Sequence, residues 1–275
     1  MTILTRMDDR VVPRLARGLG RVVDTGRAHK PRPLTVAAIV LVLAVGATGA
    51  WRLNLTPGGH DDGTSPIRVG VRDGDSVPVY ISASNAKLAM LTSQSPDRTM
   101  FALVSFIRYL NPDEVAAVVD SQPKGSVTPV FGQGRVPLPR RQTLLVTLPA
   151  GSVPADMVAE MTAIASRRAG DAASYRRLAA TEPNPSVKAI WSSNADVAQQ
   201  EAAAYRMLCS CVYALVIRAT PAEMTQLARR IDVRVVDPVP DISNSGDATF
   251  SAPLPEQVDV VAPLPDDALP PVAPS

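Results

Sequence analysis

The pattern of apolar and polar positions sets apart one long uncharged run from many shorter alternations. The run covers Leu34–Trp51 and extends to Leu55 if Arg52 reaches the interface beside Trp51. A helix needs roughly 20 apolar residues to cross a hydrocarbon core of about 30 Å, and Trp and Arg are common at its ends. We therefore predict a single transmembrane helix over residues 34–55.

The charges on either side of this run predict its orientation. Residues 1–33 hold eight Lys and Arg and three Asp, which is +5, so the rest of the chain carries −3 of a net charge of +2. Basic residues close to a span stay in the cytoplasm. We expect a cytoplasmic head at 1–33 and an extracytoplasmic location for the bulk of the chain. A cleaved signal peptide is the alternative, with small residues at 48–50 as the cleavage region.

The basic head has its own periodicity. Arg10, Arg14, Arg17 and Arg21 recur at helical spacing, with Val and Leu gathered on the other side. Such a helix can lie on the anionic inner leaflet. A disordered basic tail that only sets the orientation of the span is the alternative.

Two later stretches repeat one pattern. The apolar runs 101–104 and 213–216 are each followed by a capping sequence, Asn-Pro-Asp-Glu at 111–114 and Thr-Pro-Ala-Glu at 220–223. Asn or Thr can cap a helix, Pro suits its first position, and Glu three residues past the cap can reach back. Each stretch therefore predicts a strand that leads into a capped helix.

A second β-branched run follows each helix, at 127–131 and 233–236. The chain thus contains two strand–helix–strand units, at about 101–131 and 212–237. Two such units can share one sheet with helices on one face. We predict an internally repeated α+β domain of the ferredoxin-like, split βαβ type.

The segments around these units complete the expected domain at 67–237. Residues 56–66 have the composition of a linker, and runs at 67–71 and 77–81 predict a hairpin around Asp73-Gly74-Asp75. Residues 142–148 predict a further strand. Helical patterns from Pro154 towards Ala180 and from Val187 to Leu208 predict a helical insertion at about 152–208, either an arm or a cover for the sheet.

Proline dominates the chain after Asp237. Residues 238–275 combine many prolines and acidic residues with little apolar periodicity. Such a composition buries too little apolar surface to fold. We predict a disordered, Pro-rich extracytoplasmic tail.

Histidine content excludes several enzyme classes. The two histidines are His29, in the basic head, and His60, in the linker. A Ser-His-Asp system or a His-containing zinc site is therefore not expected in the predicted domain.

The sequence pI of about 8.7 comes from the head, so no nucleic-acid surface is expected outside the membrane. We predict no metal or cofactor.

Cys209 and Cys211 are the two cysteines of the chain. Disulfides persist outside the cytoplasm, but two cysteines two residues apart on an extended strand lie at the limit of disulfide geometry. Three alternatives stay open: a disulfide that needs a local bend, two buried thiols, or a redox, metal-binding or intermolecular role.

Charged residues on the first helix of the insertion are candidates for a surface site. Asp156 and Glu160 are four residues apart and could form an acid/base pair. Arg167 and Arg168 could bind an anionic wall polymer. For all four, an ordinary solvated helix face is the alternative.

These observations predict a single-pass bacterial protein of the cell membrane. The bias towards Ala, Val, Arg and Pro is typical of a GC-rich bacterial genome. We expect a non-catalytic extracytoplasmic domain that binds an envelope protein or a wall polymer. The alternatives are a membrane-anchored enzyme acting on envelope polymers through carboxylates, or a transmembrane relay whose basic head contacts a cytoplasmic partner.

Overall fold

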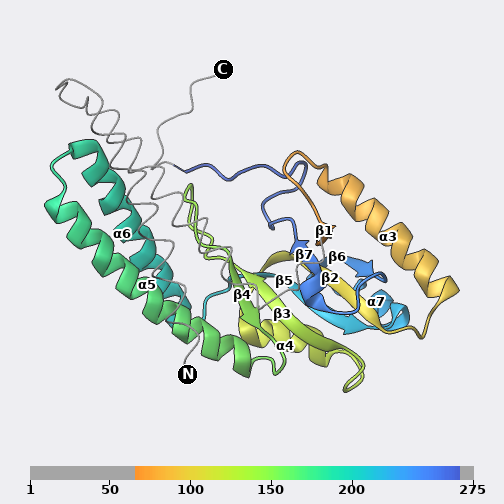
Figure 1. Cartoon of the computed structure of the whole chain (residues 1–275). Helices are drawn as coiled ribbons and strands as arrows, with labels where there is room; N and C mark the ends of the chain where they lie inside the picture. The colour runs from red at the N-terminus through yellow and green to blue at the C-terminus, as the bar shows by residue number, and fades with distance from the viewer. Residues whose placement is uncertain (1–65, 267–275) are drawn as a thin grey trace, which may run out of the picture. The chain divides into compact units, whose positions relative to one another are not determined.

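A five-stranded antiparallel sheet forms the centre of the computed structural model, which describes residues 66–266 (Figure 1). The strand order is β4-β3-β5-β2-β6, and each neighbouring pair is antiparallel. The strands are β2 (Met100–Leu110), β3 (Thr128–Gly134), β4 (Val146–Pro149), β5 (Val212–Ala219) and β6 (Val233–Val239). The predicted head and transmembrane helix, including Arg10, Arg14, Arg17 and Arg21, lie outside the described residues, as does the predicted linker except for Pro66. Among the helices that are described, none has the length and apolar character of a membrane span.

The two predicted strand–helix–strand units are present and interleaved. One is β2, α4 (Pro112–Asp120) and β3, and the other is β5, α7 (Pro221–Leu227) and β6. Strand β5 lies between the two strands of the first unit, and β2 lies between those of the second. Both capping boxes form, with Asn111 and Thr220 as the caps. The predicted α+β class is therefore confirmed.

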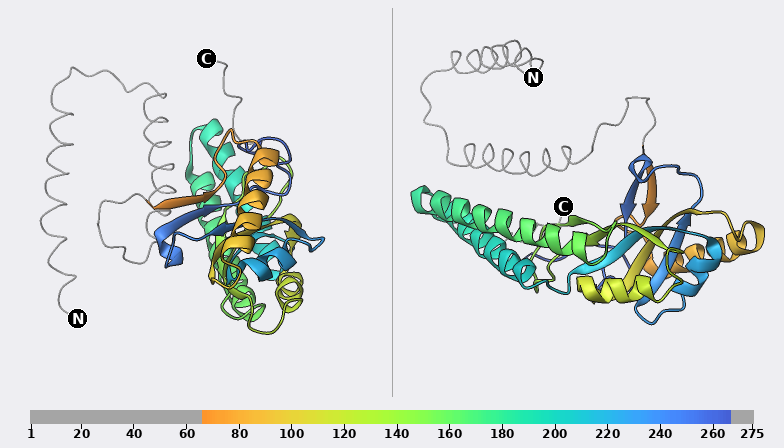
Figure 2. Two further views of the ribbon diagram at one scale, coloured as in Figure 1. Left: turned by 90° about the vertical axis from the view of Figure 1, so that its right-hand side faces the viewer. Right: turned by 90° about the horizontal axis from the view of Figure 1, so that it is seen from below.

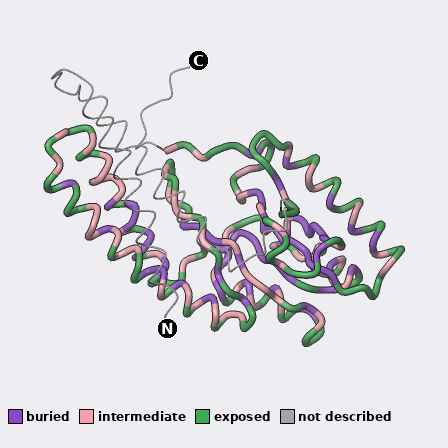
Figure 3. The backbone as a smooth tube through the Cα atoms, viewed as in Figure 1, coloured by how far each residue is buried: buried purple, intermediate pink, exposed green. Residues whose placement is uncertain are grey.

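The sheet is covered differently on its two faces. Alternate residues of β2 belong to separate apolar clusters: Ala102, Val104 and Phe106 to one, and Phe101 and Leu103 to the other. The first cluster includes side chains of α4, α5 and α7, so helices cover that face. The second includes side chains of the short parallel pair β1 (Ile67–Gly70) and β7 (Ala248–Ser251). In Figure 3 the buried residues accordingly follow the central sheet.

The predicted helical insertion is a hairpin of α5 (Ala155–Thr181) and α6 (Pro185–Arg206). Met157, Met161 and Tyr205, near the open end of the hairpin, are buried in the helix-covered face of the sheet. The opposite end projects away from the sheet (Figure 2, right view). The insertion therefore covers the sheet at its base and forms an arm beyond it.

The predicted hairpin at 67–81 is wrong in its second half. Residues 77–94 form helix α3 (Val77–Gln94), and β1 pairs with β7 instead. Ser76 stands at the N-cap and a proline lies in the first turn, where its missing N–H costs no helical hydrogen bond. Val77, Ser84, Leu88 and Leu91 are buried at spacings of one helix face, which outweighs the β-branched residues at its start.

The predicted disordered tail is also wrong over the residues that the structure describes. Pro238 and Val239 complete β6, and Phe250, Ala252 and Val261 are buried. Val239, Phe250 and Ala252 belong to the apolar cluster on one face of the sheet, and Val261 packs with Val71 and Val77. Proline is tolerated here because β6 is an edge strand. Residues 267–275 lie outside the description.

The strand predicted at 142–148 is shorter than expected. Strand β4 begins only at Val146, and the preceding residues form a loop. The side chain of Thr143 and the backbone N–H of Leu144 in this loop bind side chains from other parts of the domain. These contacts take the place of strand pairing in the residues before Val146.

Candidate functional site: an arginine-lined cavity

An open cavity of about 620 Å³ lies where β2 and β3 end. Three chain segments line it: the end of β2, the loop that follows β3, and the C-terminal residues 255–265. Its volume falls within the range of about 300–1,000 Å³ that is common for ligand sites. Arginines and prolines dominate the lining, so the cavity combines guanidinium groups with apolar faces. Arg108, Arg135 and Arg141 are each paired with a carboxylate.

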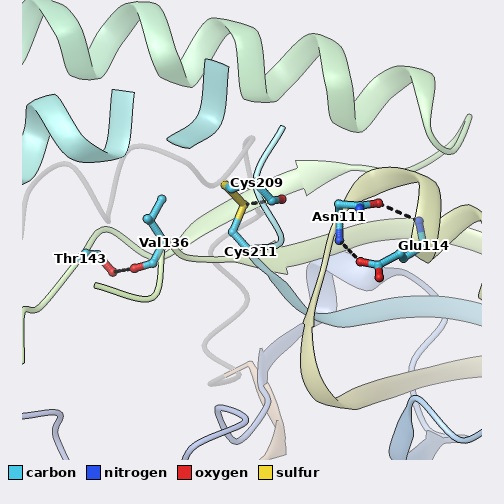
Figure 4. Close-up of a disulfide and its surroundings, with 6 residues drawn as sticks. All are labelled: Asn111, Glu114, Val136, Thr143, Cys209 and Cys211. Carbon is cyan, nitrogen blue, oxygen red and sulfur yellow. Dashed lines mark hydrogen bonds between the residues drawn. A yellow bond between two sulfur atoms is a disulfide. The ribbon is translucent and has the colours of Figure 1, made fainter. Parts of the chain in front are cut away.

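Arg135 is the fixed centre of this cavity. Its side chain is only 2% exposed, and its Nε donates to Thr143 Oγ1 at 3.1 Å. One Nη donates to the Arg141 carbonyl at 3.3 Å and the other to Glu256 Oε1 at 2.8 Å. Thr143 in turn donates to the Val136 carbonyl (Figure 4). The guanidinium therefore has one orientation, with one edge turned to a carboxylate.

Glu256 is shared between Arg135 and a tyrosine. The Tyr109 hydroxyl donates to Glu256 Oε2 at 2.9 Å. Burial raises the pKa of Tyr109, and the Glu256 carboxylate raises it further against the opposing effect of Arg135. The hydroxyl therefore stays protonated and serves as a donor. Unlike Arg135, the Glu256 side chain is 38% exposed.

Arg234 holds the turn that carries Glu256. Its guanidinium donates to the carbonyls of Leu254, Pro255 and Gln257, which surround Glu256 in the chain. Burial lowers the pKa of Arg234, and Glu256 opposes this effect. One side chain of β6 thus fixes the turn that carries the carboxylate.

Arg108 and Arg141 extend the arginine lining, and both are paired with carboxylates. Arg108 lies 2.8 Å from Glu114 and 3.0 Å from Asp232, with a side chain that is 47% exposed. Arg141 donates to the Ser193 carbonyl on α6 at 3.1 Å, and its Nε lies 3.5 Å from Asp266. Together with Arg140, they make arginine the main charged residue of the lining.

Two further polar clusters are buried elsewhere in the domain. In one, Asp237 of β6 lies 2.5 Å from Lys87 and accepts a hydrogen bond from Tyr80, both on α3. Burial raises the pKa of Tyr80, and the Asp237 charge adds to this effect. The cluster joins α3 to the sheet edge. Asp237 is buried, whereas the Lys87 side chain is partly exposed.

The other cluster joins the arm to the loop before β4. Glu201 is fully buried, and its two oxygens accept from the Leu144 N–H at 2.7 Å and from Arg168 at 2.6 Å. Arg168 also donates to Asp171. The prediction that Arg168 lies on a solvated or ligand-binding surface is therefore wrong, because this guanidinium neutralises a buried carboxylate between α5 and α6.

The other surface candidates of α5 do not converge. Asp156 accepts from the Ser152 N–H at 2.7 Å at the start of its own helix. Glu160 pairs with Arg167 at 2.6 Å. The predicted acid/base pair of Asp156 and Glu160 is therefore not formed, since each carboxylate is directed to a different partner.

Cys209 and Cys211 form a disulfide, with Cα atoms 5.4 Å apart (Figure 4). This is the first of the three predicted alternatives. The Cys211 N–H donates to the Leu110 carbonyl, and the Cys211 carbonyl accepts from the Arg135 N–H. The disulfide thus lies between the end of α6 and the strands that lead to the cavity.

Sequence reasoning missed Tyr109, Arg135 and Glu256. Arg135 follows the loop-like sequence Gly-Gln-Gly, and Glu256 lies in the segment predicted to be disordered. The sequence offered little signal beyond an acidic residue that directly follows Pro253-Leu254-Pro255. No group of metal-binding side chains is found among residues 66–266. Neither a family model, nor a curated protein, nor a solved structure matches this chain.

Proposed function

We propose that this chain is a single-pass bacterial membrane protein whose extracytoplasmic, ferredoxin-like domain binds a protein or cell-envelope component without catalysing a reaction. The arginine-lined cavity is the proposed site. The observation that carries this proposal is a volume suited to a ligand. It is lined by guanidinium groups at the end of β2 and in the loop after β3, and by apolar proline faces.

The arrangement of charges in the cavity supports binding rather than catalysis. Arg135 is fixed by Thr143 and Arg141, and Tyr109 is committed as a donor to Glu256. Fixed donors of this kind recognise a carboxylate or phosphate by geometry. The enzyme alternative finds no support at Asp156 and Glu160, which contact separate partners.

Proximity labelling in intact cells tests the proposal. A tag after Ser275 in the full chain is combined with protease protection, which reports the side of the membrane on which the tag lies. We expect a small set of envelope proteins or wall fragments to be enriched, and an R108Q/R140Q variant to reduce this enrichment at least tenfold. A tag protected from external protease would contradict the topology.

The matched control is R176Q/R177Q, which removes the same charge from the arm. Arg176 contacts Gln199 and Arg177 contacts Ser174, both away from the cavity lining. We expect this variant to keep the enrichment of the unchanged protein. Equal losses in the two variants would contradict a binding site at the cavity.

A further inference from the structure

The cavity already holds a carboxylate from its own chain. Arg135 and Tyr109 belong to the sheet and its adjoining loop, whereas Glu256 belongs to residues 252–266, which we call the C-terminal strap. A buried guanidinium needs a counter-ion, because burying an unpaired charge is strongly unfavourable. Glu256 supplies that charge at 2.8 Å, so the strap occupies the position that an external carboxylate would take.

The strap is attached on both sides of Glu256. Before it, Gln133 accepts from the Ala252 N–H and donates to the Phe250 carbonyl. After it, Val261 is buried and its N–H donates to the Asp75 carbonyl. The carboxylate itself is held by Arg135 and Tyr109 and is partly exposed. Its release therefore requires no separation of the strap from the sheet.

The strap also indicates the chemistry of a competing ligand. The residues around Glu256 read Pro253-Leu254-Pro255-Glu256, an acidic side chain in an apolar, proline-containing segment. Pro137, Leu138 and Pro139 line the cavity together with Pro255 of the strap, whereas Leu254 packs against the sheet. A peptide with a Glu or Asp among apolar residues thus complements both the charge and the apolar part of the lining.

We propose that the cavity binds an acidic peptide segment of a partner protein, whose carboxylate replaces Glu256 on Arg135 and Tyr109. This inference rests on the proposed function and deepens it. Glu256 of the strap thus competes with the partner's carboxylate for the same two donors. Because only the fraction of molecules with a vacated site binds, the apparent dissociation constant is the intrinsic one divided by that fraction.

Fluorescence anisotropy with a labelled peptide tests this inference on the full chain in detergent micelles. The probe is the sequence of residues 252–258, in which Glu256 is the one acidic side chain, and the control probe has Gln in its place. We expect the E256Q variant to bind the probe at least tenfold more tightly than the unchanged protein. The control probe is expected to show no more than a tenth of this affinity.

A second variant guards against an indirect effect of E256Q. In the E256Q background, Y109F removes one donor to the incoming carboxylate while keeping the ring, and we expect about tenfold weaker binding. Thermal unfolding of each variant reports whether the fold is kept. Equal affinity of the unchanged protein and E256Q, or equal binding of both probes, would overturn the inference.

Inorganic phosphate distinguishes a peptide site from a general anion site. We expect the probe to stay bound to E256Q in several millimolar phosphate at constant ionic strength. If phosphate displaced the probe at a concentration similar to that of the peptide, the peptide assignment would be overturned in favour of a phosphate-bearing ligand. A loss of partner enrichment in R108Q/R140Q together with a negative peptide result would leave the proposed function standing and reject this inference alone.

Discussion

Three charged residues are buried in the described part of the chain, and each has its own form of neutralisation. Arg135 is paired with a partly exposed glutamate, Glu201 with a mostly buried arginine, and Asp237 with a lysine at the domain surface. Removing one partner of a buried pair is costly because the other charge is left without compensation. We therefore expect substitution of any of these residues, or of its partner, to lower the stability of the fold, whether or not the residue lies near the cavity.

The Lys87–Asp237 pair gives the first prediction. We expect K87M to lower the free energy of unfolding by about 2 kcal/mol, less than the roughly 3–5 kcal/mol typical of a fully buried pair, because Lys87 is 40% exposed. Urea unfolding followed by circular dichroism measures this. The double variant K87M/D237N should recover part of the loss, and an additive double loss would contradict the explanation.

Glu114 gives a prediction about pH. Its hydrogen bond from the Asn111 N–H holds the pKa of Glu114 below its ordinary value, with a further contribution from Arg108 and against the effect of burial. Since the folded-state pKa is lowered, this stabilisation is present above the unfolded pKa of about 4.3 and is lost as the pH falls through the folded value. We expect E114Q to be less stable than the unchanged protein at pH 7, with a difference that shrinks as the pH falls below about 4. Urea midpoints over this range measure it, and a constant difference would contradict the assignment.

At the scale of elements, the two capping boxes explain why α4 and α7 begin where they do. In each, the cap side chain accepts from the N–H three residues on, and the glutamate there accepts from the cap N–H. Both helices are short, so tertiary packing and capping must supply most of their stability. The caps fix the point at which the chain turns from strand into helix in both units.

We expect N111A and T220A each to lower the free energy of unfolding by about 1 kcal/mol. Each substitution removes the acceptor for a first-turn N–H while leaving the apolar contacts of the helix unchanged. Chemical unfolding measures the effect, and N111D, which keeps an acceptor oxygen, is the matched control. A loss in N111D as large as in N111A would show that capping is not the cause.

Over the whole molecule, the C-terminal strap and β7 complete the core. Phe250 contacts Phe131 edge to face, and Ala252 and Val261 are buried. We expect a chain that ends at Asp247 to unfold at a temperature at least 10 °C lower, or to aggregate, because it exposes the apolar face covered by β7. A chain that ends at Asp266 is the matched comparison and should keep the thermal transition of the full chain. Equal transitions in the two shortened chains would contradict a structural role for the strap.

The parts of this fold that could be predicted are those with local signals. The capping sequences at 111–114 and 220–223 mark both units, and the helical periods of α5 and α6 are long enough to be recognised. Helix α3 was missed because its first residues, Val77 to Ile81, are typical of a strand. The cavity was missed because Arg135 and Glu256 lie 121 residues apart, and only the folded chain brings them together.

The arm formed by α5 and α6 works geometrically as a long lever. The part of α5 beyond Ala165, where its contacts with the sheet cluster end, is about 24 Å long, so a rotation of about 10° there would move its tip by roughly 4 Å. Glu201 ties the two helices to the loop at Leu144, and Arg141 joins the same loop to α6 at Ser193. A displacement of this loop too small to alter the sheet would therefore be magnified at the tip of the arm.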